Sequence, residues 1–502
     1  MAHDASIGVA LGRRRRPAMA REAAARLRAV VEHDALTIVV VALWTALFAC
    51  SLPSLFGADS WLTFVDGRLI ALHGLPRHDT LAYWTLGRRW TDQQWGAHLA
   101  FYELVRYGGP RAAGALSLAC VAGAVGGAAV VARKLGASPR GAAIGALLPL
   151  VGAPWLGQVR TQTLALAPFV AVYALLSFDA RRRDRRVLAV LPLLGIWANL
   201  HGSVALAVGL TTLYGLQRLR HSADRATSLV LVLGTPFTLF ASPYGFDLAR
   251  YYRLMLTNPA LSRIDREWQP ASVERSTIVF FGSALVLAAL WGRHRTVLTR
   301  FERWTLPILL VASLGGVRNI VWFELAAAVS APRLLDAAWR SQPPTAAVRK
   351  ANVVVAVLGV TAALAITVAQ LARPASRLEP APAAAAAVVA TAAGHIGLVL
   401  ADDSHADWLL WREPSLAGRI AYDVRFELFD QREMMRLVSV QQPWSSFWRR
   451  CGSRVAVITF PDSSWRRQLV AQRVLAQDAH LIAQSPAFGA LAQSPTAPAC
   501  RL

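Results

Sequence analysis

Uninterrupted runs of apolar residues, each close to the length needed to cross a lipid bilayer, recur through the first three quarters of the chain. Inside a bilayer every backbone N–H and C=O group must be hydrogen-bonded within the protein, so only helices and closed barrels span it. Continuous runs of about 20 apolar residues are typical of helices. Only 17% of the 502 residues are charged, against about 25% in an ordinary soluble protein. The sequence therefore predicts an α-helical polytopic membrane protein.

We predict about eleven transmembrane helices from these runs. They cover residues 36–53, 112–132, 141–156, 161–178, 187–200, 203–217, 227–242, 276–291, 304–317, 319–335 and 351–371. The expected domains are a cytoplasmic basic tail at 1–35, a transmembrane domain at 36–371 with a long outer loop at 54–110, a Pro- and Ala-rich connector at 372–394, and an extracytoplasmic α/β domain at 395–502.

The distribution of positive charge orients these helices. The formal net charge of +23 is large enough to suggest a nucleic-acid ligand. However, the arginines alternate with the apolar runs, as they do in membrane proteins whose basic loops stay in the cytoplasm. If the N-terminus is cytoplasmic, the basic segments 133–140, 181–186, 218–225, 293–303 and 333–350 all face inward. We therefore expect a multi-pass protein of the plasma membrane, in contact with lipids and not with nucleic acid, whose C-terminal domain lies outside the cell.

The last quarter of the chain has the composition of a globular domain. Short apolar runs there are typical of buried strands, and segments with a period near 3.6 residues are typical of helices. The predicted elements are strands at 396–402, 419–423 and 454–460 and helices at 427–438 and 464–477. Cys451 and Cys500 both fall in this region, where an extracytoplasmic location permits a disulfide. The sequence leaves open whether they pair.

Polar side chains at the outer ends of the predicted spans are the candidate functional residues. Ionisable groups cost roughly 2.5–3.5 kcal/mol near the centre of a bilayer, so they need partners or a wet cavity. The candidates are Asp59, Asp79, Arg160, His201, Glu267, Arg318 and Asn319. Arginines hold anionic phosphates, and a carboxylate can take the proton of an attacking hydroxyl. The set is typical of a site that transfers a sugar from a lipid-linked phosphate at the membrane surface.

Each candidate also has an ordinary structural explanation. Asp59 is suited to capping a helix, and Asp79 precedes a threonine in a probable turn, where a local backbone bond is common. His201, which is followed by a glycine, can simply complete a hairpin turn. The two arginines can anchor the chain at lipid headgroups, and Glu267 can form a surface ion pair with its arginine neighbours. The sequence leaves both sets of explanations open.

Four segments resemble the GT-C superfamily of polytopic bacterial membrane glycosyltransferases. They are residues 58–104, WANLHGS at 197–203, EWQP at 267–270 and residues 406–429. Within that superfamily the sequence is most similar to actinobacterial members, which are distantly related to the protein mannosyltransferases and the aminoarabinose transferase. The resemblance runs through most of the chain.

The resemblance implies an inverting glycosyltransferase that uses a polyprenyl-phosphate-linked sugar as donor. The acceptor is a glycan, lipid or protein of the cell envelope, and a divalent cation, Mg²⁺ or Mn²⁺, often assists members of the superfamily. An acidic residue just after the first span is their catalytic base, which corresponds here to Asp59. The predicted site therefore comprises catalytic Asp59 and Asp79, donor-phosphate ligands Arg160, His201 and Arg318, and acceptor-binding or supporting Asn319 and Glu267.

Two other functions remain open from the sequence. A transporter would use the polar residues as a translocation path and should show inverted repeats with broken helices at matching positions; we find none in the sequence. A non-catalytic scaffold for envelope assembly agrees with Ala58 and Ser60, which flank Asp59 where the superfamily often has a second acid.

Overall fold

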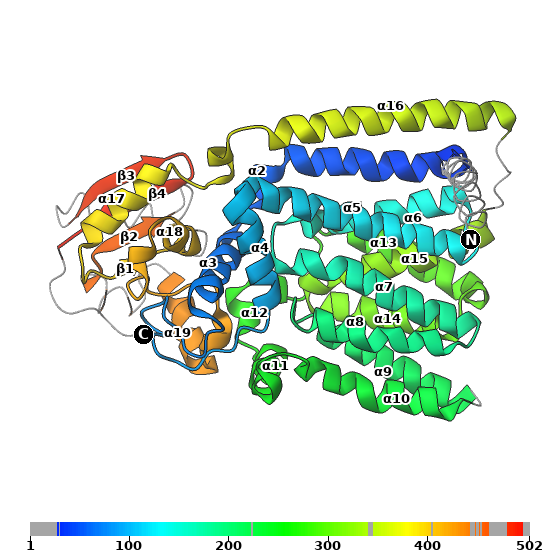
Figure 1. Ribbon diagram of the computed structural model, residues 1–502, viewed down its shortest axis with the longest axis horizontal. Helices are drawn as coiled ribbons and strands as arrows, with labels where there is room; N and C mark the ends of the chain where they lie inside the picture. The colour runs from blue at the N-terminus through cyan, green and yellow to red at the C-terminus, as the bar shows by residue number, and fades with distance from the viewer. Residues whose placement is uncertain are drawn as a thin grey trace, which may run out of the picture.

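The protein is described by a computed structural model that covers residues 28–29, 31–221, 224–339, 345–402, 405–441, 447, 451, 454–460 and 479–494. At one end of the elongated molecule, helices run roughly along its long axis and form a bundle, and at the other end lies a four-stranded sheet with its own helices (Figure 1). Between the two ends, α3 (Ala58–His73) and α4 (Trp95–Gly108) run across the long axis (Figure 1).

Helical structure occupies every one of the eleven segments predicted to span the membrane. Four helices in the described chain are long and apolar enough to do so: Val31–Cys50, α5 (Pro110–Lys134), α7 (Thr161–Arg181) and Ala347–Leu371, which forms most of α16 (Ala346–Leu371). The other seven are shorter or less apolar: α6 (Pro139–Gly152), α8 (Val190–Trp197), α9 (Val204–His221), α10 (Arg225–Phe237), α13 (Ile278–His294), α14 (Arg300–Gly315) and α15 (Ile320–Ala338). Length and composition therefore support four of the eleven predicted spans, or five if the segments Arg225–Phe240 and Gly245–Thr257, bent by 85° at their junction, form one span.

Helix α15 shows why a helix of this bundle need not be strongly apolar. Its residues from Ile320 to Leu334 are all buried, because α5, α6, α13 and α14 pack around it. Its Arg333 pairs with Glu302 of α14, which neutralises the charge inside the bundle. A helix enclosed by other helices has little contact with lipid, so it can carry paired polar groups that lower its hydropathy.

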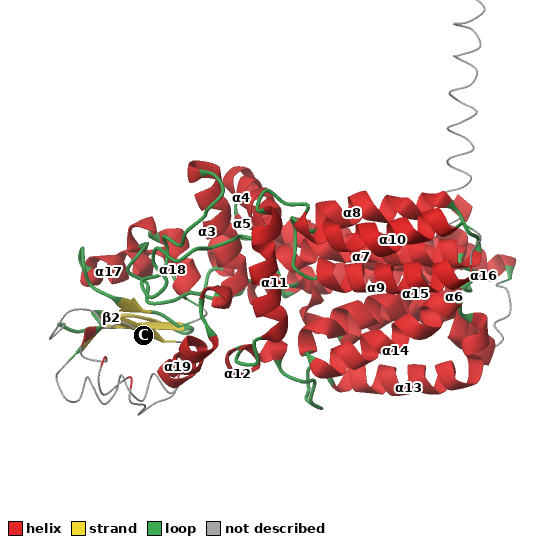
Figure 2. Ribbon diagram, turned by 90° about the horizontal axis from the view of Figure 1, so that it is seen from below, coloured by secondary structure: helices red, strands yellow, loops and turns green. Residues whose placement is uncertain are grey.

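The predicted outer loop is ordered and largely helical, as expected. It contains the end of the short helix α2 (Leu52–Leu55), then α3 and α4, joined by an irregular stretch. Trp61 and Phe64 of α3 are fully buried and join the core of the bundle. Helices α3 and α4 approach closely at Gly67, which has no side chain. A Cβ atom there would lie 2.2 Å from the carbonyl oxygen of His98. Together with α11 (Leu248–Thr257) and α12 (Leu261–Ile264), they lie between the bundle and the sheet (Figure 2).

The sheet has the strand order β1-β2-β4-β3. Its strands are β1 (Val399–Leu400), β2 (Val457–Phe460), β3 (His480–Ser485) and β4 (Phe488–Ala492), and the helices of this region are α17 (Ala383–Ala393), α18 (Ala406–Arg412) and α19 (Gln431–Gln441). Strands β1 and β2 are parallel, with Val399 opposite Val457, and the remaining pairs are antiparallel. The sheet residues Val457, Ile458 and Leu491 are completely buried and form part of the core.

Most of the predicted C-terminal elements coincide with observed ones. The predicted strands at 396–402 and 454–460 contain β1 and β2, while the one at 419–423 makes only single bridges from Ile420 to Val399 and to Ala82. The helix predicted at 427–438 corresponds to α19, and the helix predicted at 464–477 lies outside the described residues. Strands β3 and β4 were not predicted. Cys451 is disulfide-bonded, and Cys500 lies outside the described residues.

The C-terminal region is packed against the outer loop. The Arg68 guanidinium of α3 donates to the carbonyl oxygens of Leu410 and Trp411 in α18, at 2.6 and 3.0 Å. Arg88 of the outer loop makes two 2.6 Å bonds to the Glu433 carboxylate of α19. These contacts join residues that are more than 300 positions apart in the sequence. They hold the C-terminal region against α3 and the loop that precedes α4.

Candidate functional site

A polar cavity of about 120 Å³ lies where the bundle, the two crossing helices and the C-terminal region meet. Its walls come from α3, the segment leading into α4, the start of α7, the turn after α8, helices α11 and α12, and residues 424–427. Five of the seven predicted site residues line it: Asp59, Arg160, His201, Glu267 and Arg318. The fold therefore brings together side chains that lie in five separate stretches of the sequence.

Arg160 is the central cation of the cavity. It is the N-cap residue of α7 and is 7% exposed, and its Nη1 lies 2.5 Å from Oε1 of Glu267 and 3.4 Å from Oδ2 of Asp59. A positive charge at the N-terminus of a helix is opposed by the helix dipole, so the two carboxylates are what make this position tolerable. Burial works to raise the pKa of Glu267, but the guanidiniums of Arg160 and Arg318 outweigh it and hold that pKa below its usual value.

Asp59 lies in the first turn of α3 and faces the cavity. The cap of this helix is Gly57, whose N–H donates to Ser60 Oγ at 3.1 Å, so the capping role considered for Asp59 belongs to other residues. The Asp59 carboxylate lies among protein atoms. Its side chain is nevertheless 53% exposed. Burial raises the pKa of Asp59 above its usual value, and Arg160 limits that rise.

His201 follows α8 in the tight turn that leads into α9. Its Nδ1 accepts the backbone N–H of Ser203 at 3.1 Å, so in the neutral ring the proton resides on Nε2. Burial lowers the pKa of His201 well below its usual value, and the charges of Arg318 and Arg160 lower it further. At neutral pH this histidine is therefore an uncharged hydrogen-bond donor, and not a cation.

Arg318 and Asn319 diverge in what they contact. The Arg318 guanidinium lies 4.0 Å from the ring centre of Trp268, and both residues line the cavity. Asn319 does not line it, and its amide donates to the carbonyl oxygen of Ala312 at 3.0 Å, near the end of α14. The neighbouring arginine is therefore the one available to a ligand.

Asp79 lies outside the cavity and is fully engaged. Its Oδ1 accepts from the backbone N–H of Leu81 at 2.9 Å and from Arg425 Nη2 at 2.6 Å, while Oδ2 accepts from Thr85 Oγ1 at 2.6 Å. The first of these bonds is the local turn contact considered from the sequence. Asp79 thus contacts the cavity only indirectly, through Arg425.

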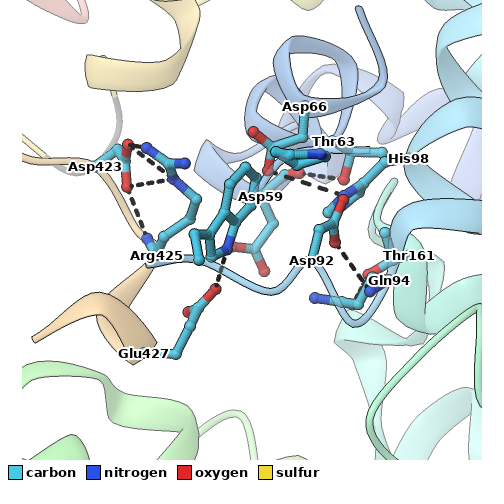
Figure 3. Close-up of polar contacts among 12 residues, drawn as sticks. Asp59, Thr63, Asp66, Asp92, Gln94, His98, Thr161, Asp423, Arg425 and Glu427 are labelled. Atoms are coloured by element: carbon cyan, nitrogen blue, oxygen red, sulfur yellow. Dashed lines mark hydrogen bonds and ion pairs between the residues drawn. The ribbon is translucent and has the colours of Figure 1, made fainter. Parts of the chain in front are cut away.

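Five further ionisable residues line the cavity and were not among the candidates predicted from the sequence. They are Asp66, Asp92, His98, Arg425 and Glu427. Figure 3 shows Arg425 beside Asp423 and above Glu427, with the His98 group on the opposite side. The Arg425 guanidinium is 4.4 Å from the ring centre of Trp90 and bonds to both oxygens of Asp423.

Asp66 and His98 form a buried acidic corner with Asp92. The His98 Nδ1 lies 2.8 Å from Oδ2 of Asp92 and 3.9 Å from Oδ2 of Asp66, and neither carboxylate oxygen of Asp66 has a hydrogen bond among the described residues. Burial raises the pKa of Asp66 well above its usual value, against the opposing charges of Arg425 and His98. Burial works to lower the pKa of His98, but the two aspartates outweigh it and raise that pKa.

The divalent cation implied by the resemblance stays a prediction. A protein site for Mg²⁺ or Mn²⁺ needs several oxygen or nitrogen ligands arranged around one point. Nowhere in the described chain do three or more His, Cys, Asp or Glu side chains converge in that way. The reaction derived below therefore has no step that passes through a metal.

Comparison with known proteins identifies the fold. The structure is similar to that of ArnT from Cupriavidus metallidurans bound to undecaprenyl phosphate, with a TM-score of 0.50 and 15% sequence identity over 92% of this chain and 98% of that one. It is also similar to the apo oligosaccharyltransferase from Archaeoglobus fulgidus, with a TM-score of 0.50 and 12% identity over 84% of this chain and 69% of that one. The chain has the GT-C fold. No protein-family model matches the sequence, and a search of curated proteins finds no match.

The similarity extends over most of the chain. The matched region includes the bundle, the crossing helices and the C-terminal region, since it covers 92% of the chain. Together with the four apolar spans, it identifies an integral membrane protein. In this GT-C fold the cavity lies at the end of the bundle where α3 and α4 cross it.

Proposed function

We propose that the protein is a membrane glycosyltransferase that moves a sugar from a polyprenyl-phosphate-linked donor to a cell-envelope acceptor. The structural neighbours are a transferase bound to undecaprenyl phosphate and an oligosaccharyltransferase. We further propose that the N-terminus is cytoplasmic, and that the cavity and the C-terminal region face the extracytoplasmic side of the plasma membrane.

The donor phosphate binds, in this proposal, at the start of α7. Thr161 and Gln162 of its first turn line the cavity, and the N-terminus of a helix is a favourable site for an anion. Arg160 and Arg318 supply guanidiniums that can form charge-assisted bonds to phosphate oxygens. The Nε2–H of His201 adds a neutral donor, which stabilises charge developing on the leaving phosphate.

The proposed chemical step is a single displacement. Asp59 accepts the proton of the acceptor hydroxyl while the acceptor oxygen attacks the anomeric carbon of the donor sugar. The bond between that carbon and the phosphate oxygen breaks, and its electron pair leaves on polyprenyl phosphate. Attack from the face opposite the phosphate inverts the anomeric carbon. Asp59 then releases its proton to water, which restores the carboxylate.

The observation that carries this proposal is the 3.4 Å contact between Asp59 and Arg160 in one cavity, because the proposed reaction needs a carboxylate beside a cation. The test is Asp59→Asn, assayed as transfer from a radiolabelled polyprenyl-phosphate sugar in vesicles. We expect a loss of about 10²- to 10⁴-fold, the usual contribution of a general base. The matched control is Asp184→Asn, because Asp184 is 50% exposed and pairs with Arg186 at 3.4 Å beyond the other end of α7, away from the cavity. Turnover of Asp59→Asn equal to wild type would remove the mechanism.

A further inference from the structure

A second hollow of about 320 Å³ adjoins the catalytic cavity. It is bounded by residues 88–91 of the outer loop, by Arg250, Tyr251 and Leu254 of α11, and by residues 427–433 of the C-terminal region. Trp90, Tyr251 and Glu427 line both spaces and form their common wall. The two spaces therefore adjoin at these three side chains, and the hollow is the larger space.

The charges around the hollow nearly balance, with Glu427, whose pKa burial raises to about 7, only partly ionised at neutral pH. Its three guanidiniums belong to Arg88, Arg89 and Arg250, and its three carboxylates belong to Glu427, Asp430 and Glu433. Arg88 is paired with Glu433, and Arg89 with Asp247. A site for an anionic ligand would carry an excess of cations, and a site for a cationic ligand an excess of acids. The hollow matches an uncharged ligand.

Two groups remain available to such a ligand. The exposed Arg250 has no hydrogen bond or ion pair with any residue that the structure describes. On the common wall, Oε1 of Glu427 accepts from the indole N–H of Trp90 at 3.4 Å, and burial raises the pKa of Glu427 to about 7. A guanidinium and a carboxyl group offer donors and acceptors of the kind that sugar hydroxyls need.

The hollow also offers apolar ring surfaces. The half-buried ring of Tyr251 is the accessible one, whereas Trp90 and Phe429 are only 3% and 1% exposed and contribute mainly their edges. A ligand that fits aromatic rings, free hydrogen-bonding groups and no net charge is polyhydroxylated and neutral, with apolar C–H faces. Neutral carbohydrate has that combination.

We propose that this hollow is the acceptor site and that the acceptor is a neutral carbohydrate chain. The inference rests on the proposed function and specifies its acceptor. The chain lies in the hollow, and the hydroxyl that receives the sugar passes the common wall at Trp90 and Tyr251 to reach Asp59.

The test compares two substitutions on α11. Arg250→Glu changes a residue that lines the hollow, whereas Arg253→Glu makes the same change on an exposed residue of the same helix that does not line it. Binding of neutral trisaccharides of glucose, mannose and galactose to the full-length protein is measured by saturation-transfer NMR, with trigalacturonate as the anionic comparison. We expect at least one neutral trisaccharide to bind wild type and Arg253→Glu equally, and to bind Arg250→Glu about tenfold more weakly, the factor expected for one hydrogen bond to a charged group.

The proposal is overturned if no neutral trisaccharide binds, if both variants lose binding equally, or if trigalacturonate binds as well as the neutral trisaccharides. Because binding is measured without donor, this result is independent of the Asp59→Asn assay. A failure of the acceptor assignment can therefore be told apart from a failure of the proposed reaction. Arg250→Gln, which retains a donor and adds no negative charge, should lose less binding than Arg250→Glu.

Discussion

At the scale of single residues, the pKa of Asp59 is set by two opposing effects. Burial raises it, and the Arg160 guanidinium 3.4 Å away lowers it. A base must be deprotonated to act, so kcat/KM should fall as the pH drops through this pKa. Removing Arg160 removes the lowering effect, so we expect Arg160→Gln to move the acid limb of the profile to higher pH, besides raising KM for the donor. The measurement is kcat/KM against pH for both proteins; an acid limb at the same pH in each would contradict Asp59 as the titrating base.

Arg425 gives a residue-scale prediction about stability. It is 2% exposed and holds Asp79 and Asp423, and its charge also acts on the buried Asp66. Removing one partner of a buried charge network costs about 3–5 kcal/mol, because the remaining charges lose their compensation. We expect Arg425→Met to lower the thermal unfolding midpoint in detergent markedly and Arg425→Lys to lower it less. Arg419→Met is the control, since its guanidinium bonds only to the carbonyl oxygen of Ser415 in the described structure.

How many site residues could be predicted depends on how far along the chain their partners lie. Asp59 and Asp66 are seven residues apart on one helix, a spacing that places them on the same face, so Asp66 could have been included. Arg425 could not, because its partner Asp79 is 346 positions away and only the packing of the C-terminal region joins them. Asp79 itself was recognised as polar and unusual, but the sequence gives no sign that a buried arginine would engage it.

At the scale of elements, Gly67 sets the distance between α3, which carries Asp59 and Asp66, and α4, which carries His98. A Cβ atom there would lie 2.2 Å from the His98 carbonyl oxygen and 2.4 Å from the Cβ of Tyr102. Overpacking of this kind typically costs about 1–3 kcal/mol. We expect Gly67→Ala to lower the unfolding midpoint and to weaken transfer, since it separates α3 from α4.

The control for this substitution is Gly123→Ala in α5, where a Cβ meets nothing within 4 Å. Alanine favours a helix by about 1 kcal/mol over glycine, so the control should keep or raise the midpoint. A gain in both variants would show that helix propensity, and not the close approach of α3 and α4, governs Gly67.

The positions of the helices could be predicted well from the sequence. Which of these helices are long and apolar enough to cross the membrane could be predicted less well. Apolar runs mark the helices of the bundle both where a helix is enclosed by protein, as α15 is, and where it is largely exposed, as α16 is. Whether a helix meets lipid or other helices depends on packing, as the fully enclosed α15 shows. Strands β3 and β4 could not be predicted, because neither has a pronounced alternation of apolar and polar residues. The segment HLIAQS of β3 is half exposed. The segment FGALA of β4 consists largely of small residues, and its burial depends on the strands and helices that pack around it.

At the scale of the whole molecule, the distribution of charge and the position of the cavity are related. The cavity lies at the end of the bundle where α5 and α7 meet the crossing helices, and the arginine-rich segment 181–186 follows the opposite end of α7 (Figure 1). Basic segments resist translocation across the membrane. In the orientation that we propose, the arginines stay in the cytoplasm and the cavity faces the outside, where the proposed lipid-linked donor would present its sugar.

This orientation predicts a labelling pattern for introduced cysteines. Arg186 is 89% exposed after α7, and Ser376 is exposed just beyond α16 at the end near the cavity. In a background with Cys50→Ser and Cys120→Ser, which removes the two free cysteines of the described chain, a membrane-impermeant maleimide should label Ser376→Cys in intact cells. Arg186→Cys should be labelled only after the membrane is permeabilised. The reversed pattern would place the cavity in the cytoplasm and would exclude transfer from a donor on the outer face, even if Asp59 proved to be the base.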